Sequence, residues 1–265
     1  MKVVLITGAS SGIGRATALE LASPEVMLVL VARRLKRLKA LEARIQQSGG
    51  NAISIPADLS VADNVEPMID GALDRYGRID ILINNAGVGY FGTVENTPRE
   101  VIDEILALNF TAPLIATQRV LPNMRRRGSG HIINVSSVVG KRGLPLLGIY
   151  CASKFALAGI SESLRVELRE AGIHVSLVYP GATETDFFNA LRKGDVNGNF
   201  HPPGYIQPVR KVARAIARCI ERPRAEVYPC KPIHLLVWFN AIFPQVVDRL
   251  MTSYLRGVLQ PDRRT

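Results

Sequence analysis

The sequence is poor in cysteine, histidine and aromatic residues, and this shortage excludes several kinds of protein. Of 265 residues, three are cysteines, four are histidines and one is a tryptophan. An odd number of cysteines cannot all pair in disulfide bonds, and neither the cysteines nor the scattered histidines have the spacing of metal ligands. We therefore predict a reduced, cytoplasmic chain that holds no metal.

The sequence also lacks an apolar run long enough for a secretion signal or a membrane span. The apolar stretch 3–6 leads directly into a glycine turn, and the apolar stretch 233–243 ends at Pro244, short of the ~20 residues that a span requires. We instead predict an apolar helical tail over 232–260. The stripe at helical spacing that supports it consists of Val247, Leu250, Met251, Tyr254 and Val258.

Three roles are open for this tail, and the net charge of +10 bears on one of them. The tail would cap a substrate pocket, pack on another subunit, or lie in a membrane surface with help from the basic residues of 210–224. We favour packing and expect a homodimer or homotetramer, with peripheral membrane contact as the alternative. The charge is spread over several clusters without a nucleic-acid-binding motif, so we expect no nucleic acid partner.

Apolar β-branched stretches alternate with amphipathic segments almost to the end of the chain. This alternation predicts parallel strands joined by helices, and therefore one α/β Rossmann-fold domain over 1–265 with a doubly wound parallel sheet of about seven strands. The predicted strands are 2–7, 26–32, 52–57, 79–84, 130–136, 174–179 and 226–229. The long predicted helices are 34–47, 61–76, 99–127 and 150–171. The irregular segment 186–208 is expected beside the substrate, because it follows the sixth strand at the carboxyl edge of the sheet.

A glycine-rich turn with the spacing G-x-x-x-G-x-G follows the first predicted strand and opens a helix. Gly8 permits a tight turn, and Gly12 and Gly14 let backbone amides and the start of the helix approach a pyrophosphate. The turn therefore predicts a dinucleotide site. Its expected contact residues are Gly8, Ser10, Ser11, Gly12, Ile13 and Gly14.

The second predicted strand ends without the acidic residue that an NAD site usually places at the ribose 2′-hydroxyl. Arg33 and Arg34 follow it instead. A guanidinium group matches a 2′-phosphate in shape and charge, so this position favours NADP(H) over NAD(H). The alternative is that both arginines only begin the basic helix.

Tyr150 and Lys154 lie four residues apart in a predicted helix, which places the phenol and the ammonium on one face. A free tyrosine titrates near about 10, and a fixed positive charge beside it favours the phenolate and lowers that pKa. We therefore regard the pair as a candidate proton-transfer device. Cys151 beside it is expected to be a small packed side chain.

Four motifs in this order resemble those of the short-chain dehydrogenase/reductase family over roughly residues 1–190. They are the glycine turn, the segment 84–87, the pair Tyr150 and Lys154, and the segment 179–185. The resemblance implies hydride transfer between a nicotinamide and a CH-OH or C=O carbon. It implies further cofactor contacts at Asp58, Leu59, Asn85, Ala86, Gly87, Pro180, Gly181, Thr183 and Thr185. One departure is Ser11, where many NADP-preferring members have a basic residue, so our prediction of NADP(H) depends on Arg33 and Arg34.

The same resemblance implies a catalytic set of Asn109, Ser137, Tyr150 and Lys154. Tyr150 would be the general acid in reduction and the general base in oxidation, with Ser137 hydrogen-bonded to the carbonyl oxygen. Lys154 would also bind the nicotinamide ribose, and Asn109 would position a water that links Lys154 to solvent. The resemblance implies Ser137 rather than Ser136, because the family's serine stands thirteen residues before the tyrosine; neighbouring residues of a strand point to opposite faces, so only one of the two can face the site.

Apolar residues flank this set and predict the substrate class. Leu144 precedes the tyrosine, and Phe187 and Phe188 follow the segment 179–185. We expect a hydrophobic ketone, aldehyde or secondary alcohol, and no ligand role for His201. The alternative function is a non-catalytic nucleotide sensor or scaffold on the same fold, which would not need a complete proton-transfer set.

Overall fold

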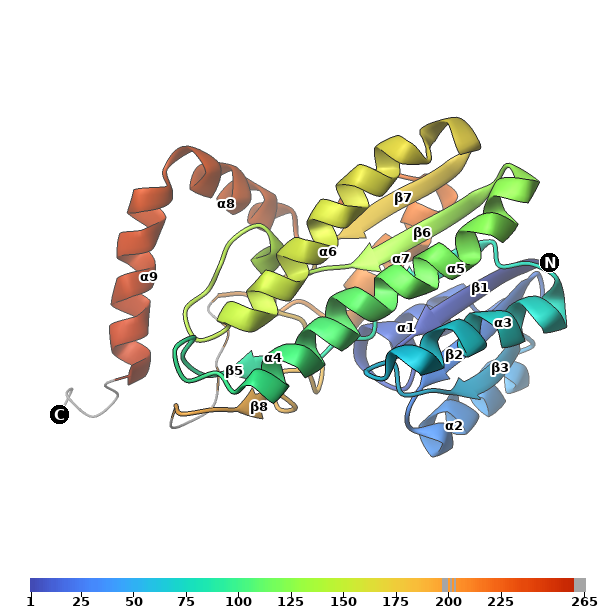
Figure 1. The fold of residues 1–265 in the computed structure, drawn as a ribbon, viewed down its shortest axis with the longest axis horizontal. Helices are drawn as coiled ribbons and strands as arrows, with labels where there is room; N and C mark the ends of the chain where they lie inside the picture. The colour runs from blue at the N-terminus through green and yellow to red at the C-terminus, as the bar shows by residue number, and fades with distance from the viewer. Residues whose placement is uncertain (197–199, 201, 203, 260–265) are drawn as a thin grey trace.

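The β-branched stretches of the sequence pair side by side as seven parallel strands in the order β3-β2-β1-β4-β6-β7-β9 (Figure 1). The structure is a computed structural model that describes residues 1–196, 200, 202 and 204–259, and of residues 231, 233, 236 and 254–259 it describes the backbone alone. The strands are β1 (Lys2–Thr7), β2 (Val26–Ala32), β3 (Asn51–Pro56), β4 (Ile81–Asn84), β6 (Gly130–Val135), β7 (Ile173–Val178) and β9 (Glu226–Val227). This doubly wound parallel sheet confirms the predicted Rossmann fold, with strand ends shifted by one or two residues.

Helices cover both faces of the sheet because successive strand residues point to opposite sides. Val3 and Leu5 join one apolar core, and Val4 and Ile6 join the other. The helices over the first core are α3 (Val65–Tyr76), α5 (Ala112–Arg127) and α6 (Gly148–Glu167). The helices over the second core are α1 (Gly12–Leu21), α2 (Leu35–Gln47) and α7 (Val209–Glu221).

The predicted helix 99–127 is not continuous. It consists of α4 (Arg99–Leu106), a π-helical turn η2 (Ala107–Thr111) and α5. The wider turn directs Asn109 into the protein, where its side-chain amide donates to Val88 O at 2.8 Å and accepts from Val88 N at 2.9 Å. A π-helical turn inside a long helix often marks a functional position, and this one holds a predicted site residue.

Other predicted helices begin or end with tighter turns. The 3-10 turn η1 (Ala62–Asn64) precedes α3, and η4 (Arg169–Ala171) follows α6. A third 3-10 turn, η3 (Val138–Gly140), comes directly after β6 and carries the chain across the carboxyl edge of the sheet. These turns account for the differences from the predicted bounds 61–76 and 150–171.

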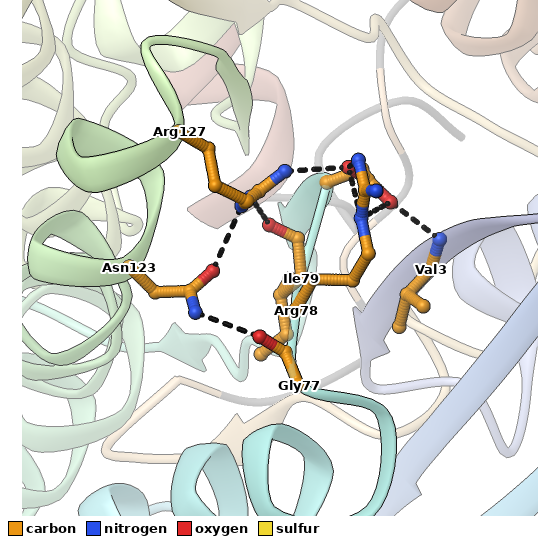
Figure 2. A network of polar contacts seen from close by, with 7 residues as sticks. Val3, Gly77, Arg78, Ile79, Asn123 and Arg127 are labelled. Atoms are coloured by element: carbon orange, nitrogen blue, oxygen red, sulfur yellow. Dashed lines mark hydrogen bonds and ion pairs between the residues drawn. The ribbon is translucent and has the colours of Figure 1, made fainter.

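A polar network fixes the amino edge of the sheet, opposite the strand ends that carry the predicted site (Figure 2). Asp80 precedes β4, and its carboxylate accepts hydrogen bonds from Val3 N at 2.8 Å, Arg78 Nε at 2.9 Å and Arg127 Nη1 at 2.8 Å. Arg127 also donates to Asn123 at 3.1 Å. The network ties β1, β4 and the end of α5 together, and leaves the carboxyl edge free for a ligand.

Two further units lie at the carboxyl edge. In one, β5 (Tyr90–Phe91) pairs in parallel with β8 (Arg192–Lys193) of the segment 186–208. The other is the tail, which forms α8 (Lys231–Ile242) and α9 (Pro244–Leu259) and stands apart from the covering helices (Figure 1). Within the described residues, no helix is both long and apolar enough to cross a membrane.

Candidate active site

The carboxyl ends of the strands surround a cavity of about 970 Å³. Of the residues that we predicted for the site, all but Gly14 and Asn109 line this cavity. The structure therefore brings the glycine turn, the serine, the tyrosine, the lysine and the segment 179–185 to one place. His201, for which we expected no ligand role, lies outside the described residues.

The glycine turn is packed too tightly for side chains at two of its positions. Gly8 has a φ of +68°, and a Cβ atom there would lie 2.8 Å from Asn85 Nδ2. At Gly14 a Cβ atom would lie 2.5 Å from Gly8 O. Gly14 thus lies behind the turn and allows α1 to pack against it, whereas Gly12, with a φ of +53°, faces the cavity.

The start of α1 fits a pyrophosphate group. Ser11 occupies the position before the helix and, among the described residues, makes no side-chain capping bond, so the amides of the first helical turn are left for a ligand. The opposite wall of this part of the cavity is tied to the turn by Thr7, whose hydroxyl accepts from Asn85 N at 2.9 Å and Ala86 N at 3.0 Å. The donors and the shape of this cradle fit a dinucleotide.

Two guanidinium groups stand at the end of β2. Arg34 reaches over the glycine turn and donates to Ser10 Oγ at 2.9 Å and to Ser11 Oγ at 2.7 Å. Arg33 is exposed and lies 3.7 Å from the carboxylate of Asp58, at the end of β3. Burial opposes the ionised form of Asp58, but hydrogen bonds from Ser60 and the charge of Arg33 lower its pKa below the usual value.

The tyrosine and the predicted serine meet in the structure. Tyr150 is 8% exposed, and Ser137 is the side chain whose interaction with the phenol opposes the effect of burial on its pKa; the Ser137 hydroxyl also donates to Pro180 O at 3.5 Å. The hydroxyl of Ser136 instead donates to Lys154 O at 3.1 Å and holds α6 in place. This geometry favours Ser137 as the residue beside a reacting carbonyl.

Lys154 is buried beneath the tyrosine. Its ammonium donates to Val135 O at 3.0 Å and lies 5.8 Å from the centre of the Tyr150 ring. Asn109 approaches the same point from η2, because a Cβ atom on Gly87 would lie 3.2 Å from Asn109 Oδ1 and 3.5 Å from Lys154 Nζ. Asn109 is fully buried behind the cavity wall and also donates to Ser153 Oγ at 3.0 Å.

Our expectation for the pKa of the tyrosine was wrong for the protein without a ligand. Burial raises the pKa of Tyr150 well above its ordinary value, and the interaction with Ser137 offsets only part of this rise. Burial also lowers the pKa of Lys154 to about 8. Spacing predicted that the phenol and the ammonium are neighbours, but it could not predict that both groups lose most of their water. This loss outweighs the attraction between the phenolate and an ammonium that lies 5.8 Å from the centre of the ring.

The segment 179–185 is held by a residue that the sequence did not single out. Gln207 is fully buried, and its side chain donates to Thr183 Oγ1 at 3.1 Å. Thr183 in turn donates to Gly181 O at 2.8 Å, and Pro180 O accepts from Val138 N at 3.0 Å. These bonds fix the wall that carries Thr183 and Thr185 across from the glycine turn.

The remaining part of the cavity is mainly apolar. The Phe187 ring lies 5.2 Å from the Tyr150 ring, and Leu144 and Phe188 line the same region, as predicted. The tail supplies further lining that we had left open, namely Val237, Phe239, Val247, Leu250 and Met251. Sequence reasoning missed the polar lining residues Arg142 and Asn240, because neither belongs to a recognisable motif.

Comparisons with known proteins agree with this arrangement. A profile of the short chain dehydrogenase family matches residues 2–195. The Arabidopsis thaliana protein named 11-beta-hydroxysteroid dehydrogenase-like 3 is 36% identical over 269 residues, which cover 98% of this chain and 85% of that protein.

Two solved structures show the likeness in three dimensions. A short chain dehydrogenase/reductase from Burkholderia phymatum in complex with NAD has a TM-score of 0.82 at 27% identity, covering 92% of this chain and 94% of that one. A short-chain dehydrogenase from Sphingobium yanoikuyae in complex with NADPH has a TM-score of 0.79 at 33% identity, covering 95% and 96%. This chain therefore belongs to the short-chain dehydrogenase/reductase family of oxidoreductases, whose nicotinamide dinucleotide site it carries.

Proposed function

We propose that this protein transfers hydride between NADP(H) and the carbonyl or alcohol carbon of an apolar substrate, with Tyr150 as the general acid or base. The observation that carries the proposal is that Tyr150, Ser137 and buried Lys154 line the same cavity as the glycine turn. A protein that only sensed or displayed a nucleotide would not need these three groups together.

The chemistry divides between cofactor and protein. When bound, the nicotinamide supplies or accepts the hydride. Tyr150 donates its phenolic proton to the carbonyl oxygen during reduction, and Ser137 hydrogen-bonds the same oxygen as its negative charge develops. The ammonium of Lys154 favours the phenolate that remains, and its pKa of about 8 keeps a proton available near neutral pH. Asn109 fixes the cavity wall behind Lys154. It also orders the path by which solvent returns a proton to Lys154.

The preference for NADP(H) follows from the charge at the end of β2. Arg34 presents a guanidinium directly over the turn, and Arg33 stands beside it at the mouth of the cavity. Within the described residues, the only ion pair of either arginine is the one with Asp58, which lies at the end of β3 and not at the end of β2. A 2′-phosphate would therefore meet two positive groups. Of the two related structures described above, one was solved with NAD and the other with NADPH. The preference between the two cofactors is therefore argued from the residues of this chain.

The substrate class follows from the lining beside Tyr150. Phe187, Phe188 and Leu144 leave a largely apolar space next to the phenol. A bulky hydrophobic ketone, aldehyde or secondary alcohol would bury apolar surface there at about 25 cal/mol per Å². The relative named for a hydroxysteroid dehydrogenase is compatible with such a compound.

A panel of apolar ketones and aldehydes tests the proposal through the loss of NADPH absorbance. We expect turnover of at least one member by the wild-type protein, and loss of turnover in Tyr150→Phe with NADPH binding retained. Tyr76→Phe, the same change on α3 away from the cavity, serves as the matched control. Near-normal turnover in Tyr150→Phe would refute the mechanism, and NADPH binding without any turnover by the wild type would favour a sensor or scaffold.

A further inference from the structure

The tail exposes an unusual amount of apolar surface. We call α8 and α9 together the tail hairpin. Seven large apolar side chains in this hairpin are at least 41% exposed, whereas the other exposed ones are scattered singly or in pairs over the rest of the described chain. The seven are Leu235, Trp238, Phe239, Ile242, Phe243, Val246 and Leu250. Large apolar side chains exposed together on one unit in this way mark a contact surface.

The same hairpin forms a wall of the cavity. Val237, Asn240, Val247 and Met251 line the cavity, while Leu235, Trp238 and Ile242 do not line it and are 62% to 72% exposed. The hairpin therefore has one side toward the substrate region and another toward the surroundings. Whatever covers the outer side therefore lies against a wall of the cavity.

Few contacts attach the hairpin to the rest of the protein. Arg142, after η3, forms an ion pair with Asp248 of α9. The His234 ring lies 4.5 Å from the Tyr228 ring and accepts a hydrogen bond from Trp238 Nε1 at 3.2 Å. These contacts orient α8 without covering its outer apolar residues.

Charge indicates which kind of surface covers the hairpin. The tail hairpin, residues 231–259, contains three basic residues and one acidic residue, and the acidic Asp248 is already paired with Arg142. The basic residues are Lys231, Arg249 and Arg256. Two such positive hairpins would repel each other in a symmetric contact, whereas an anionic lipid surface would attract them.

The dimensions of α8 agree with an interfacial position. Its 12 residues span roughly 18 Å at 1.5 Å per residue, less than the ~30 Å of a bilayer core. Trp238, with its polar ring nitrogen and apolar body, is the side chain that favours the boundary between lipid headgroups and acyl chains. A helix of this length is too short to cross the bilayer core.

We propose that the tail hairpin binds the surface of an anionic lipid bilayer through Leu235, Trp238 and Ile242, and that the apolar substrate enters the cavity from that bilayer. The second part depends on the function proposed above, whereas the binding itself does not. Lipid contact places the tail wall of an apolar cavity where apolar carbonyl compounds concentrate.

Trp238 is the only tryptophan in the chain, so its fluorescence reports the contact directly. With the full-length wild-type protein, vesicles of phosphatidylcholine and phosphatidylserine should shift its emission to shorter wavelength. Brominated acyl chains in those vesicles should quench it, and added salt should weaken binding. Absence of both the shift and the quenching at low salt would overturn the proposal. So would equal binding to vesicles of phosphatidylcholine alone, since it would remove the role of charge.

A variant tests the named residues by sedimentation with the same vesicles. Leu235→Ser combined with Ile242→Ser keeps Trp238 as the probe and should weaken vesicle binding at least about tenfold, or 1.4 kcal/mol. Val166→Ser, at a 74% exposed position on α6, is the matched control and should bind like the wild type. Unchanged NADPH affinity verifies folding. If the double variant instead lost self-association while the wild type ignored vesicles, a second copy of the chain would be the occupant and the proposal would be wrong.

Entry from the bilayer has its own measurement. With NADPH, the KM for a lipophilic ketone presented in anionic vesicles should be several-fold higher for the double variant, while the KM for a small water-soluble ketone stays the same. Equal KM values for the lipophilic ketone would refute entry from the bilayer. Because fluorescence and sedimentation need no turnover, failure of the proposed function would leave the binding result intact and is distinguishable from it.

Discussion

Arg34→Ala removes the guanidinium that reaches over the glycine turn, and we expect it to weaken the binding of NADPH far more than that of NADH. In the structure Arg34 is anchored to Ser10 and Ser11 by hydrogen bonds of 2.9 and 2.7 Å. The anchors fix the group at the place where the ribose end of a dinucleotide leaves β2. A phosphate there would gain a preformed charged donor.

The size of the effect follows from the exposure of this group. A hydrogen bond to a charged group contributes about 1.5–3 kcal/mol, and solvent screening at an exposed arginine favours the lower part of that range. A loss of about 1.5–2 kcal/mol corresponds to a roughly 10- to 30-fold higher Kd for NADPH. NADH has no phosphate at this position, so its Kd should change by less than about threefold.

Isothermal titration calorimetry with both cofactors measures this difference. Arg37→Ala removes the same charge from an exposed position one turn further along α2, and should leave the ratio of the two Kd values close to that of the wild type. Ser11→Ala removes one anchor and should give a smaller change of the same kind. Equal weakening of NADPH and NADH in Arg34→Ala would refute the phosphate role and show that Arg34 only holds the turn.

Three other predictions concern the sheet, the lysine and the turn. Asp80→Ala should lower the free energy of unfolding by about 2–3 kcal/mol in urea denaturation, because Arg127 and Val3 N lose their shared acceptor. Burial opposes the ionised form of Asp80, but bonds from Arg78 and Val3 N lower its pKa, so its contribution to stability is present above about pH 4 and is lost as the pH falls through the lowered pKa. If the free energies of unfolding of the wild type and the variant changed in the same way with acid pH, this role of Asp80 would be contradicted. With a pKa of about 8, Lys154 should lose its proton as pH rises, so kcat/KM for reduction should fall above about pH 8. Lys154→Arg should move this fall in kcat/KM to higher pH. A kcat/KM that does not depend on pH would count against the role of Lys154. Gly8→Ala should abolish measurable cofactor binding, since its Cβ atom would lie 2.8 Å from Asn85 and 2.9 Å from Ala86. Cofactor affinity equal to that of the wild type would show that the turn can shift to accept the side chain.

The sheet and its order were predictable because each buried parallel strand is a short apolar run between turn signals. Val26–Ala32 is a clear case, since both of its faces are covered and almost every residue is apolar. The two-residue strands β5 and β8 were not predictable, because their pairing depends on how the segment 186–208 folds back. Asp195 holds that fold by accepting from Thr93 N at 2.9 Å and Asn96 Nδ2 at 2.8 Å, contacts about a hundred residues apart in sequence.

The candidate site shows a similar division. Helical spacing brought Tyr150 and Lys154 to one face, and the family resemblance implied Ser137, which lines the same cavity. Sequence reasoning did not predict the π-helical turn at Asn109, although Pro113 marks it: a proline has no N–H to donate to Asn109 O four residues earlier. Nor did it predict Gln207, which bonds Thr183 through its side chain and Ala182 and Glu184 through its backbone, and belongs to no motif.

Burial is the property that sequence patterns conveyed least well. The helical pattern brought an ammonium to a phenol and suggested a lowered tyrosine pKa. The structure places both groups in a site with little water, where the pKa of Tyr150 rises and that of Lys154 falls. Desolvation depends on everything packed around a pair and is not encoded in local spacing.

Hydride transfer to an apolar carbonyl compound is the central claim, and deuterium labelling tests it most directly. NADPH carrying deuterium at the transferable position of the nicotinamide is incubated with the wild-type protein and a ketone that it reduces, and the alcohol is analysed by mass spectrometry. We expect one deuterium at the carbinol carbon of the product, and none without the protein or with Tyr150→Phe. An alcohol product without deuterium at that carbon, from either face of the labelled nicotinamide, would contradict the account.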